Sequence, residues 1–229
     1  MILSVHQPQY IPWLGYFHKI AKSDLFVFLD DVQYKKREFQ NRNKIKTPAG
    51  PLWLTVPVIT KGSFTQNIKD VLTSNDDNWA LDHWKSIEHN YHRAECFKEH
   101  ETFFKDTYSA KWERLMDISL ATVNYALNYL NIRTPLKMSS EYDLQSTSTE
   151  RIIDLCKKTG ADTYLSGAGG KDYMDLSLFE KNNIKLLFQD FNHPQYTQLY
   201  GVFEPYLSFI DLVMNCGVKS RDILTEGAA

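Results

Sequence analysis

The stretch that decides the fold is Ile2-Leu3-Ser4-Val5-His6-Gln7-Pro8, near the beginning of the chain. Its apolar run ends in a polar, proline-containing segment, which predicts a buried strand that opens into a loop. Pro12 then suits the first turn of a helix, and apolar residues recur at helical spacing up to Ala21. The next apolar run, Leu25–Leu29, is continuous and therefore predicts a central strand that is covered on both faces.

Further elements follow along the chain. Residues 39–58 predict a hairpin or a strand pair around a turn at 47–50. Helical patterns dominate from about Asn78 to Leu130, where we expect two or three helices beside the sheet. A helix capped at Thr149 and stopped at Gly160, and a last helix over 209–215, complete the helical pattern.

Two more short strands are predicted at Asp162–Leu165 and Ile184–Phe188. Because strands and helices alternate at both ends of the chain, we expect an α/β fold. Its core is a doubly wound, mainly parallel Rossmann-like sheet with an inserted helical segment. Residues 1–229 would form a single domain, with a helical subregion at about 76–132.

The composition limits the classes of function. With 229 residues, 43% hydrophobic and 24% charged, the chain reads as an ordinary globular protein. A formal net charge of −2 creates no overall field for nucleic acid or anionic membranes, so we expect no DNA partner. The cysteines are odd in number and lie outside any CxxC pair, which favours reduced thiols over disulfides or zinc: Cys96, Cys156 and Cys216. The absence of a signal peptide or an apolar run of roughly 18 residues predicts a cytoplasmic protein without membrane insertion.

The loop after the first strand is the first candidate site. His6 is the side chain there that can act as an acid or base near neutral pH. Gln7, Tyr10 and Trp13 offer amide, phenol and indole groups that suit a sugar or a base. The alternative is that prolines stiffen this loop while the aromatic side chains fill the core.

Two carboxylates, Asp30 and Asp31, follow the predicted central strand. Ligands bind at the carboxyl edge of an open α/β sheet, so this position favours a functional role. The pair can hold a metal, orient a histidine or accept hydrogen bonds from hydroxyl groups. A solvated turn would look similar.

The densest basic stretch of the chain comes next. Gln33 and Lys36 belong to it, and Arg42 stands between Asn41 and Asn43, where its guanidinium suits a bidentate phosphate clamp. Exposed lysines alone are unremarkable, so we give Arg42 the most weight. The histidines of the helical stretch complete no metal-binding pattern with acids or cysteines, and we expect no metal site.

Glycines after a predicted strand form the third candidate, in Ser166, Gly167, Gly169 and Gly170. Free backbone N–H groups in such a loop bind phosphate or carboxylate, although the Walker spacing is absent and a tight turn is an equal alternative. The segment 192–196, with His193, echoes the composition of the opening loop. If both loops lie on one sheet edge, two histidines face one pocket.

Taken together, the motifs resemble the WbqC-like family. The resemblance runs through nearly the whole chain and is carried by six motifs in order: His-Gln-Pro-x-Tyr-x-Pro-Trp-Leu-Gly-Tyr-Phe at 6–17, Asp-Asp-Val-Gln-Tyr at 30–34, Asn-Arg-Asn at 41–43, Leu-Thr-Val-Pro-Val at 54–58, Tyr-Leu-Ser-Gly-x-Gly-Gly at 164–170 and Asp-Leu-x-x-Asn-Cys-Gly at 211–217. This family is associated with gene clusters for O-antigen and related surface polysaccharides. The resemblance implies modification of nucleotide-linked amino sugars, with attachment of an acyl or aminoacyl group to the sugar amine.

A weaker resemblance concerns layout. The order of strand, loop, helix and strand is similar to the first unit of nucleotidyltransferases with a HIGH motif and of pantothenate synthetase. Those enzymes bind the phosphates of ATP with two histidines, whereas Pro12 and Tyr16 stand in those places here and only Gly15 remains. This departure argues against ATP chemistry.

Our leading hypothesis is a transferase that forms an amide on the amine of a nucleotide-linked amino sugar. Arg42 and the loop Gly167–Gly170 would hold the diphosphate, and Tyr10 and Trp13 would stack on the sugar or base. His6, oriented by Asp30 or Asp31, would take the proton as the amine attacks the donor.

The donor is open between an acyl-CoA, a charged tRNA and an adenylate. One alternative is an ATP-dependent enzyme that forms adenylates or transfers nucleotidyl groups, and another is a non-catalytic nucleotide-sugar binding protein. The oligomeric state is open, and a homodimer is compatible with the chain.

Overall fold

The computed structural model describes residues 1–63 and 65–226. Its centre is a five-stranded sheet in the order β5-β2-β1-β6-β7, and every pair of neighbours is parallel. The first strand of the chain therefore lies in the middle of the sheet. The strands are β1 (Ile2–His6), β2 (Leu25–Phe28), β5 (Leu136–Met138), β6 (Thr163–Ser166) and β7 (Lys185–Phe188). This confirms the predicted α/β, Rossmann-like fold.

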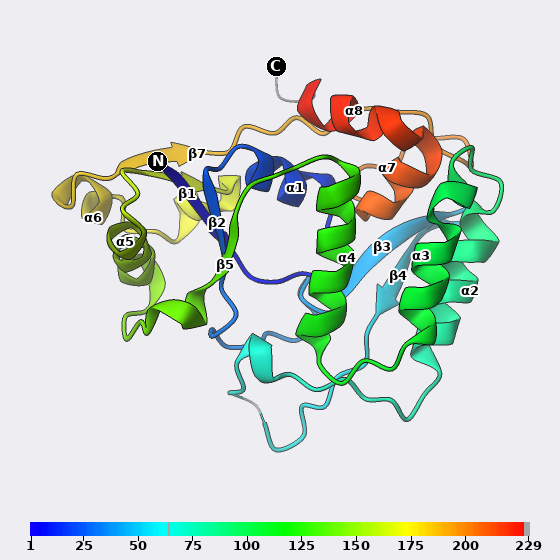
Figure 1. The fold of residues 1–229 in the computed structure, drawn as a ribbon, viewed down its shortest axis with the longest axis horizontal. Coiled ribbons are helices and arrows are strands. Elements are labelled where there is room, and N and C mark those ends of the chain that lie inside the picture. The colour runs from blue at the N-terminus through cyan, green and yellow to red at the C-terminus, as the bar shows by residue number, and fades with distance from the viewer. Residues whose placement is uncertain (64, 227–229) are drawn as a thin grey trace.

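Helices cover both faces of the sheet (Figure 1). One group comprises α1 (Leu14–Ala21), α7 (Phe209–Cys216) and α8 (Ser220–Glu226), and the other comprises α5 (Ser148–Thr159) and α6 (Leu176–Lys181). Side chains of β2 alternate between the two sides: Phe26 and Phe28 join the apolar cluster with α1 and α7, and Val27 joins the cluster with α5 and α6. The continuous apolar run of this strand is thus explained by burial on both faces.

The expected helical segment is present as α2 (Trp79–Tyr91), α3 (Phe97–Ser109) and α4 (Leu115–Tyr129). It lies beside an antiparallel hairpin of β3 (Arg42–Thr47) and β4 (Gly50–Thr55), which confirms the predicted hairpin. Gly50 has a φ of +107° at the turn, a conformation that favours glycine. Short single turns complete the chain: η1 (Ile68–Asp70), η2 (Ser139–Tyr142), η3 (Ala168–Asp172) and η4 (Gly217–Lys219).

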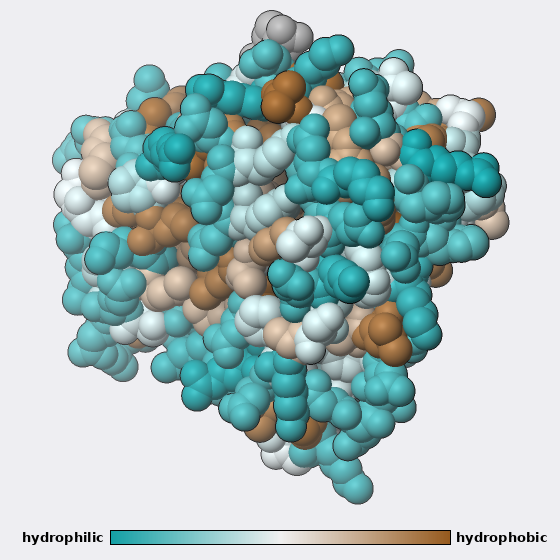
Figure 2. Space-filling model, turned by 45° about the vertical axis from the view of Figure 1, so that its right-hand side comes forward, coloured by the Kyte–Doolittle hydropathy of each residue, from teal (hydrophilic) through white to brown (hydrophobic). Residues whose placement is uncertain are grey.

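The edge strand β5 is absent from the sequence prediction. It has only three residues, so it shows no readable alternation, and its pairing with β2 positions it. Helix α5 begins at Ser148, one residue before the predicted cap at Thr149. Among the described residues, no helix is long and apolar enough to cross a membrane. The face shown in Figure 2 is mostly hydrophilic, with apolar side chains in small separate groups.

The chain changes direction across the sheet between β1 and β6. From β1 the sheet grows through β2 and β5 on one side and through β6 and β7 on the other. The backbone ladder between β1 and β6 pairs only Ile2 with Thr163 and Leu3 with Tyr164. In sheets of this type, ligands bind at such a switch point, outside the carboxyl ends of the strands. The carboxyl ends of these two strands are His6 and Ser166, which are both predicted site residues.

Candidate functional site

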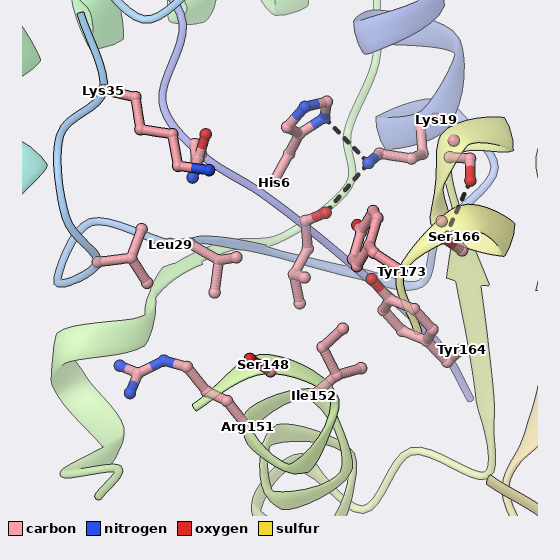
Figure 3. A pocket seen from close by; sticks show the side chains of 16 residues that line it. His6, Lys19, Leu29, Lys35, Ser148, Arg151, Ile152, Tyr164, Ser166 and Tyr173 are labelled. Atoms are coloured by element: carbon pink, nitrogen blue, oxygen red, sulfur yellow. Dashed lines mark hydrogen bonds between the residues drawn. The ribbon is translucent and has the colours of Figure 1, made fainter. Parts of the chain in front are cut away.

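A cavity of about 660 Å³ opens at the switch point, between the ends of β1 and β6 and the first turns of α5 (Figure 3). Its volume lies within the range of pockets that bind small molecules. Its lining comes from β1 and the loop after it, from α1, from the loop after β2, from the first turns of α5, and from β6 with the glycine loop and the residue after η3. The lining residues are Val5, His6, Gln7, Lys19, Leu29, Val32, Lys35, Ser148, Arg151, Ile152, Tyr164, Ser166, Gly167, Gly169, Gly170 and Tyr173.

The polar lining of this cavity is cationic. Lys35 and Arg151 supply its positive charge, and none of its described lining residues is a carboxylate. In Figure 3, Lys35 and Arg151 lie at one side of the cavity and Tyr164 and Tyr173 at the other. Because a concave, partly enclosed surface strengthens the field of its charges, the arrangement favours an anionic ligand.

Lys19 reaches the end of β1 from α1 and is almost fully buried. Its Nζ donates hydrogen bonds to the carbonyl oxygen of Val5 and to Nδ1 of His6, and each donor–acceptor distance is 3.0 Å. Burial lowers the pKa of Lys19 to about 7. Burial, and then the nearby Lys19, keep the pKa of His6 well below its usual value, so the imidazole is neutral at pH 7.

The predicted orientation of His6 by Asp30 or Asp31 is wrong. Nδ1 of His6 faces Lys19, and Nε2 lies 3.4 Å from the amide nitrogen of Gln9. The ring also packs on Tyr16, with 4.9 Å between centroids. A lysine on the following helix, rather than an acid on the neighbouring strand, therefore controls this imidazole.

The two acids instead connect segments around the cavity. Asp30 is buried and accepts two hydrogen bonds from Ser140, one from the backbone N–H at 2.9 Å and one from the side-chain hydroxyl at 2.6 Å. Asp31 accepts from Ser139 Oγ and forms an ion pair with Arg151. Both carboxylates thus anchor β2 to the chain that follows β5, and Asp31 positions a cationic side chain of the cavity.

Gln7 and the loop after β6 occupy the cavity wall, as their sequence positions predict. The side-chain oxygen of Gln7 accepts from Gln40 over 2.9 Å, and the oxygen of Gln40 accepts from the backbone N–H of Lys35 over 3.0 Å. At Gly170, an added Cβ would lie 2.1 Å from Ser166 Oγ, so a larger residue does not fit. This close approach brings η3 against the end of β6.

A second cavity, of about 270 Å³, adjoins the first at the beginning of α1. Trp13, predicted as a stacking residue, lines it and lies across Gly15, where a Cβ would be 2.2 Å from the indole. Gly15 is therefore required by the packing of Trp13. The other lining residues are His6, Tyr16, Lys19, Gly167, Ala168, Gly169, Gln189 and Phe191.

Tyr10 and Asn43 lie in the core, and their predicted contact with a ligand is wrong. Tyr10 is fully buried, and its hydroxyl lies 2.8 Å from Nδ1 of His83 and 2.5 Å from the hydroxyl of Tyr108. Asn43 is also fully buried and donates to the carbonyl oxygen of Ile11 over 2.9 Å. Both side chains fix the opening loop to the hairpin and the helical segment.

Arg42 does not share a pocket with the glycine loop, so the predicted joint diphosphate clamp is wrong. It lines a separate, open pocket of about 270 Å³ at the hairpin together with Lys36 and Asn41. Its guanidinium lies 4.4 Å from the ring centre of Trp53. Asn41 donates to the carbonyl oxygen of Val56 over 2.8 Å. Gln33 is exposed and forms an antiparallel bridge with Asn67.

His193 packs among aromatic side chains. Its ring contacts Phe191, Tyr196, Phe203 and Tyr206, and its Nδ1 lies 2.9 Å from the carbonyl oxygen of Pro194. No described residue of the segment 192–196 lines the smaller cavity beside His6; Gln189 and Phe191, which precede the segment, do. The chain just before the second loop therefore contributes an amide and a phenyl ring there instead of a second histidine.

Sequence reasoning missed several residues of the main cavity. Lys19 is a single charged residue among the apolar residues of α1, which is a signal for a buried amine. Arg151 and Ser148 lie in the first turn of α5, whose N-terminus faces the cavity. Tyr164 and Tyr173 carried no pattern beyond their places around the glycine loop.

Comparisons with known proteins give matches over nearly the whole chain. The model of the WbqC-like protein family matches residues 7–223. A protein of Mycobacterium tuberculosis described as uncharacterized protein Rv1507c is 38% identical over 224 residues, which cover 97% of this chain and 96% of the relative. No solved structure gives a significant match.

Proposed function

The chain belongs to the WbqC-like protein family, and we propose that it is a transferase of surface-polysaccharide biosynthesis that forms an amide on a nucleotide-linked amino sugar. The group transferred is an acyl or aminoacyl group, taken from an activated donor. One observation carries the proposal: the main cavity at the switch point of the sheet has a cationic lining, with no carboxylate among the lining residues that the structure describes.

The contacts of the main cavity suit a nucleotide sugar. Lys35 and Arg151 would meet the diphosphate, because guanidinium and ammonium groups bind phosphate oxygens with charge-assisted hydrogen bonds. The backbone of Gly167–Gly170 would bring further N–H groups close to the ligand. The exposed Tyr173 offers a ring at the opposite side, where a sugar or a base would lie.

The experiment that tests this function is a panel of reactions followed by mass spectrometry. Each reaction contains one dTDP- or UDP-linked amino sugar and either an acyl-CoA or glycine, with and without ATP. The expected product is the sugar nucleotide with the mass of one added acyl or glycyl group. Saturable binding of nucleotide sugars by calorimetry without any product would instead support a binding protein.

A second candidate is an ATP-dependent enzyme that forms an adenylate. The observation in its favour is the smaller cavity, which opens at the first turn of α1 beside the end of β1. Against it, the indole of Trp13 occupies the space over Gly15. This candidate predicts exchange of pyrophosphate into ATP in the presence of a carboxylic acid. A panel of acids that gives no exchange would remove it.

A further inference from the structure

The two cavities meet at one group of residues. His6, Lys19, Gly167 and Gly169 line both of them. Lys19 Nζ lies at this junction: it donates hydrogen bonds to Val5 and His6 at the end of β1, and a Cβ on Gly167 would lie 4.0 Å from it. A molecule in either cavity is therefore next to the same amine.

The cavities differ in the chemistry of their other walls. The larger one carries Lys35 and Arg151, whereas the smaller one is bounded by Trp13, Tyr16 and Phe191. Gln189 lies in the wall of the smaller cavity and donates to the carbonyl oxygen of Gly15 over 2.8 Å. The larger cavity thus suits the charged part of a nucleotide sugar, and the smaller one suits an uncharged group such as an acyl chain.

The hydrogen bonds of Lys19 define where its lone pair points. A neutral amine has two hydrogens and one lone pair. The carbonyl oxygen of Val5 accepts one hydrogen, and Nδ1 of His6 accepts the other when the imidazole carries its proton on Nε2. A half-turn of the Gln9 amide would give that Nε2–H an acceptor, because Gln9 Oε1 is buried without a partner. The lone pair of Lys19 is then left for the cavities.

We propose that Lys19, at the junction of the two cavities, is the catalytic base of the transfer and that His6 is its positioning residue. This proposal rests on the proposed function. The sugar nitrogen attacks the carbonyl carbon of an acyl thioester in the smaller cavity, so that a C–N bond forms and the C–S bond breaks with its electron pair on sulfur. The nitrogen loses a proton to Lys19 Nζ, and Lys19 passes that proton to the leaving thiolate, which regenerates the neutral amine.

The electrostatic surroundings agree with this role. Burial lowers the pKa of Lys19 to about 7, near the value that suits a general base at neutral pH. The other titratable groups among the described residues of the two cavities include no acid that would hold Lys19 charged: His6, Tyr16, Lys35, Arg151, Tyr164 and Tyr173.

Competitive acetylation of the intact protein with trace acetic anhydride tests the free amine independently of any substrate. Peptide mass spectrometry from pH 6 to pH 10 follows Lys19, with the exposed Lys22 of the next turn as the internal reference. We expect acetylation of Lys19 to reach half its maximum near pH 7 and to fall when a nucleotide sugar is bound. Labelling that rises only at the alkaline pH typical of exposed lysines would overturn the assignment.

The transfer assay then distinguishes the role of Lys19 from that of His6. Lys19→Met should lower kcat by about 10²–10⁴-fold, the usual contribution of a general base, with nucleotide-sugar affinity within a few-fold of wild type. His6→Gln keeps an acceptor for the lysine N–H and should lower kcat by less than about 10-fold. The reverse order of the two effects would make His6 the base.

Two further outcomes are decisive. Lys19→Arg should be as inactive as Lys19→Met, because an arginine keeps its proton at every pH used; an active arginine variant would show that only positive charge is needed. If the wild-type protein forms no amide with any donor, the proposed function fails and the role of Lys19 as base fails with it. A low-pH acetylation midpoint would still establish the neutral amine in that case.

Discussion

Arg151 donates from Nη2 to Oδ2 of Asp31, and this ion pair joins the carboxyl end of β2 to the first turn of α5. Both side chains are largely enclosed, with exposed fractions of 11% for Arg151 and 17% for Asp31. Because Asp31 also accepts from Ser139, one carboxylate holds two segments beside the cavity. The pair therefore fixes the wall from which Arg151 meets a ligand.

We expect Asp31→Asn to lower the free energy of unfolding by about 1–3 kcal/mol, since the enclosed guanidinium loses its charged partner. Urea unfolding of this variant, of Arg151→Met and of the double variant forms a complete cycle. The double variant should lose less than the sum of the two single losses. Strictly additive losses would show that the ion pair does not stabilise the wall.

Two neighbouring lysines allow a direct test of which pocket binds the anion. Lys35 lines the main cavity and Lys36 lines the separate pocket at the hairpin. We expect Lys35→Ala to weaken the binding of a UDP-sugar by about 5–30-fold at low salt, in line with the loss of one charge-assisted contact of about 1–2 kcal/mol. Lys36→Ala should change the affinity by less than about 2-fold, because Lys36 lines the other pocket and solvent and salt screen its exposed charge. A larger effect of Lys36→Ala in calorimetry would move the anion site to the hairpin.

The glycine loop offers a matched pair of substitutions. Gly170→Ala places a Cβ 2.1 Å from Ser166 Oγ, whereas nothing lies within 4 Å of a Cβ on Gly169. We expect Gly170→Ala to cost about 1–3 kcal/mol of stability through overpacking, and Gly169→Ala to leave the melting temperature near that of wild type. Ser166→Ala combined with Gly170→Ala should recover part of the loss. Equal melting temperatures for the two single variants would contradict this account of the loop.

Lys19 should give the stability a specific dependence on pH. Burial lowers its pKa from 10.5 to about 7 in the folded protein. Between these values the unfolded chain binds a proton that the folded protein has released, so this contribution to stability rises with pH, by up to about 1.4 kcal/mol per pH unit. Below pH 7 both states are protonated and the contribution is constant. We expect the free energy of unfolding of wild type, relative to that of Lys19→Met, to rise with pH only above pH 7. Urea unfolding of both proteins from pH 6 to pH 10 measures this, and a relative stability that does not change with pH would contradict the low pKa.

Tyr10 should matter for stability and not for binding. Tyr10→Phe removes the hydroxyl between His83 and Tyr108, two buried groups that then lose a partner. We expect a loss of about 1–3 kcal/mol in the free energy of unfolding. The affinity for a UDP-sugar should match that of wild type, because the ring is fully buried in the core. A selective loss of affinity at unchanged stability would return Tyr10 to the site.

The order of strands and helices was predictable because the spacing of apolar residues differs between the two kinds of element. The run Leu25–Leu29 needs apolar residues at every position since its alternate side chains enter two different clusters. The same apolar pattern also shows where β1 and β6 end, and ligands bind at the carboxyl ends of such strands. His6, Gln7 and Ser166, at or just after these ends, do line the cavity. Edge strand β5 has too few residues to show such a pattern.

The rest of the site depends on directions that a linear pattern does not contain. Tyr10 and Trp13 are three residues apart and chemically alike, yet one enters the core and the other the smaller cavity. Asp31 and Arg151 are 120 residues apart, and only the packing of α5 brings them together. The apolar neighbours of Lys19 in α1 indicate that it is buried, but they do not show that its amine lies beside His6 and the glycine loop.

The position of β1 between β2 and β6 also determines when the site can form during synthesis. Its partner β2 follows within the first 30 residues, but β6, on its other side, begins only at Thr163. Until that strand leaves the ribosome, the inner edge of β1 has unpaired N–H and C=O groups, a template for pairing with another chain. A product truncated before Thr163 would leave this edge of β1, which ends at His6, open and prone to aggregation.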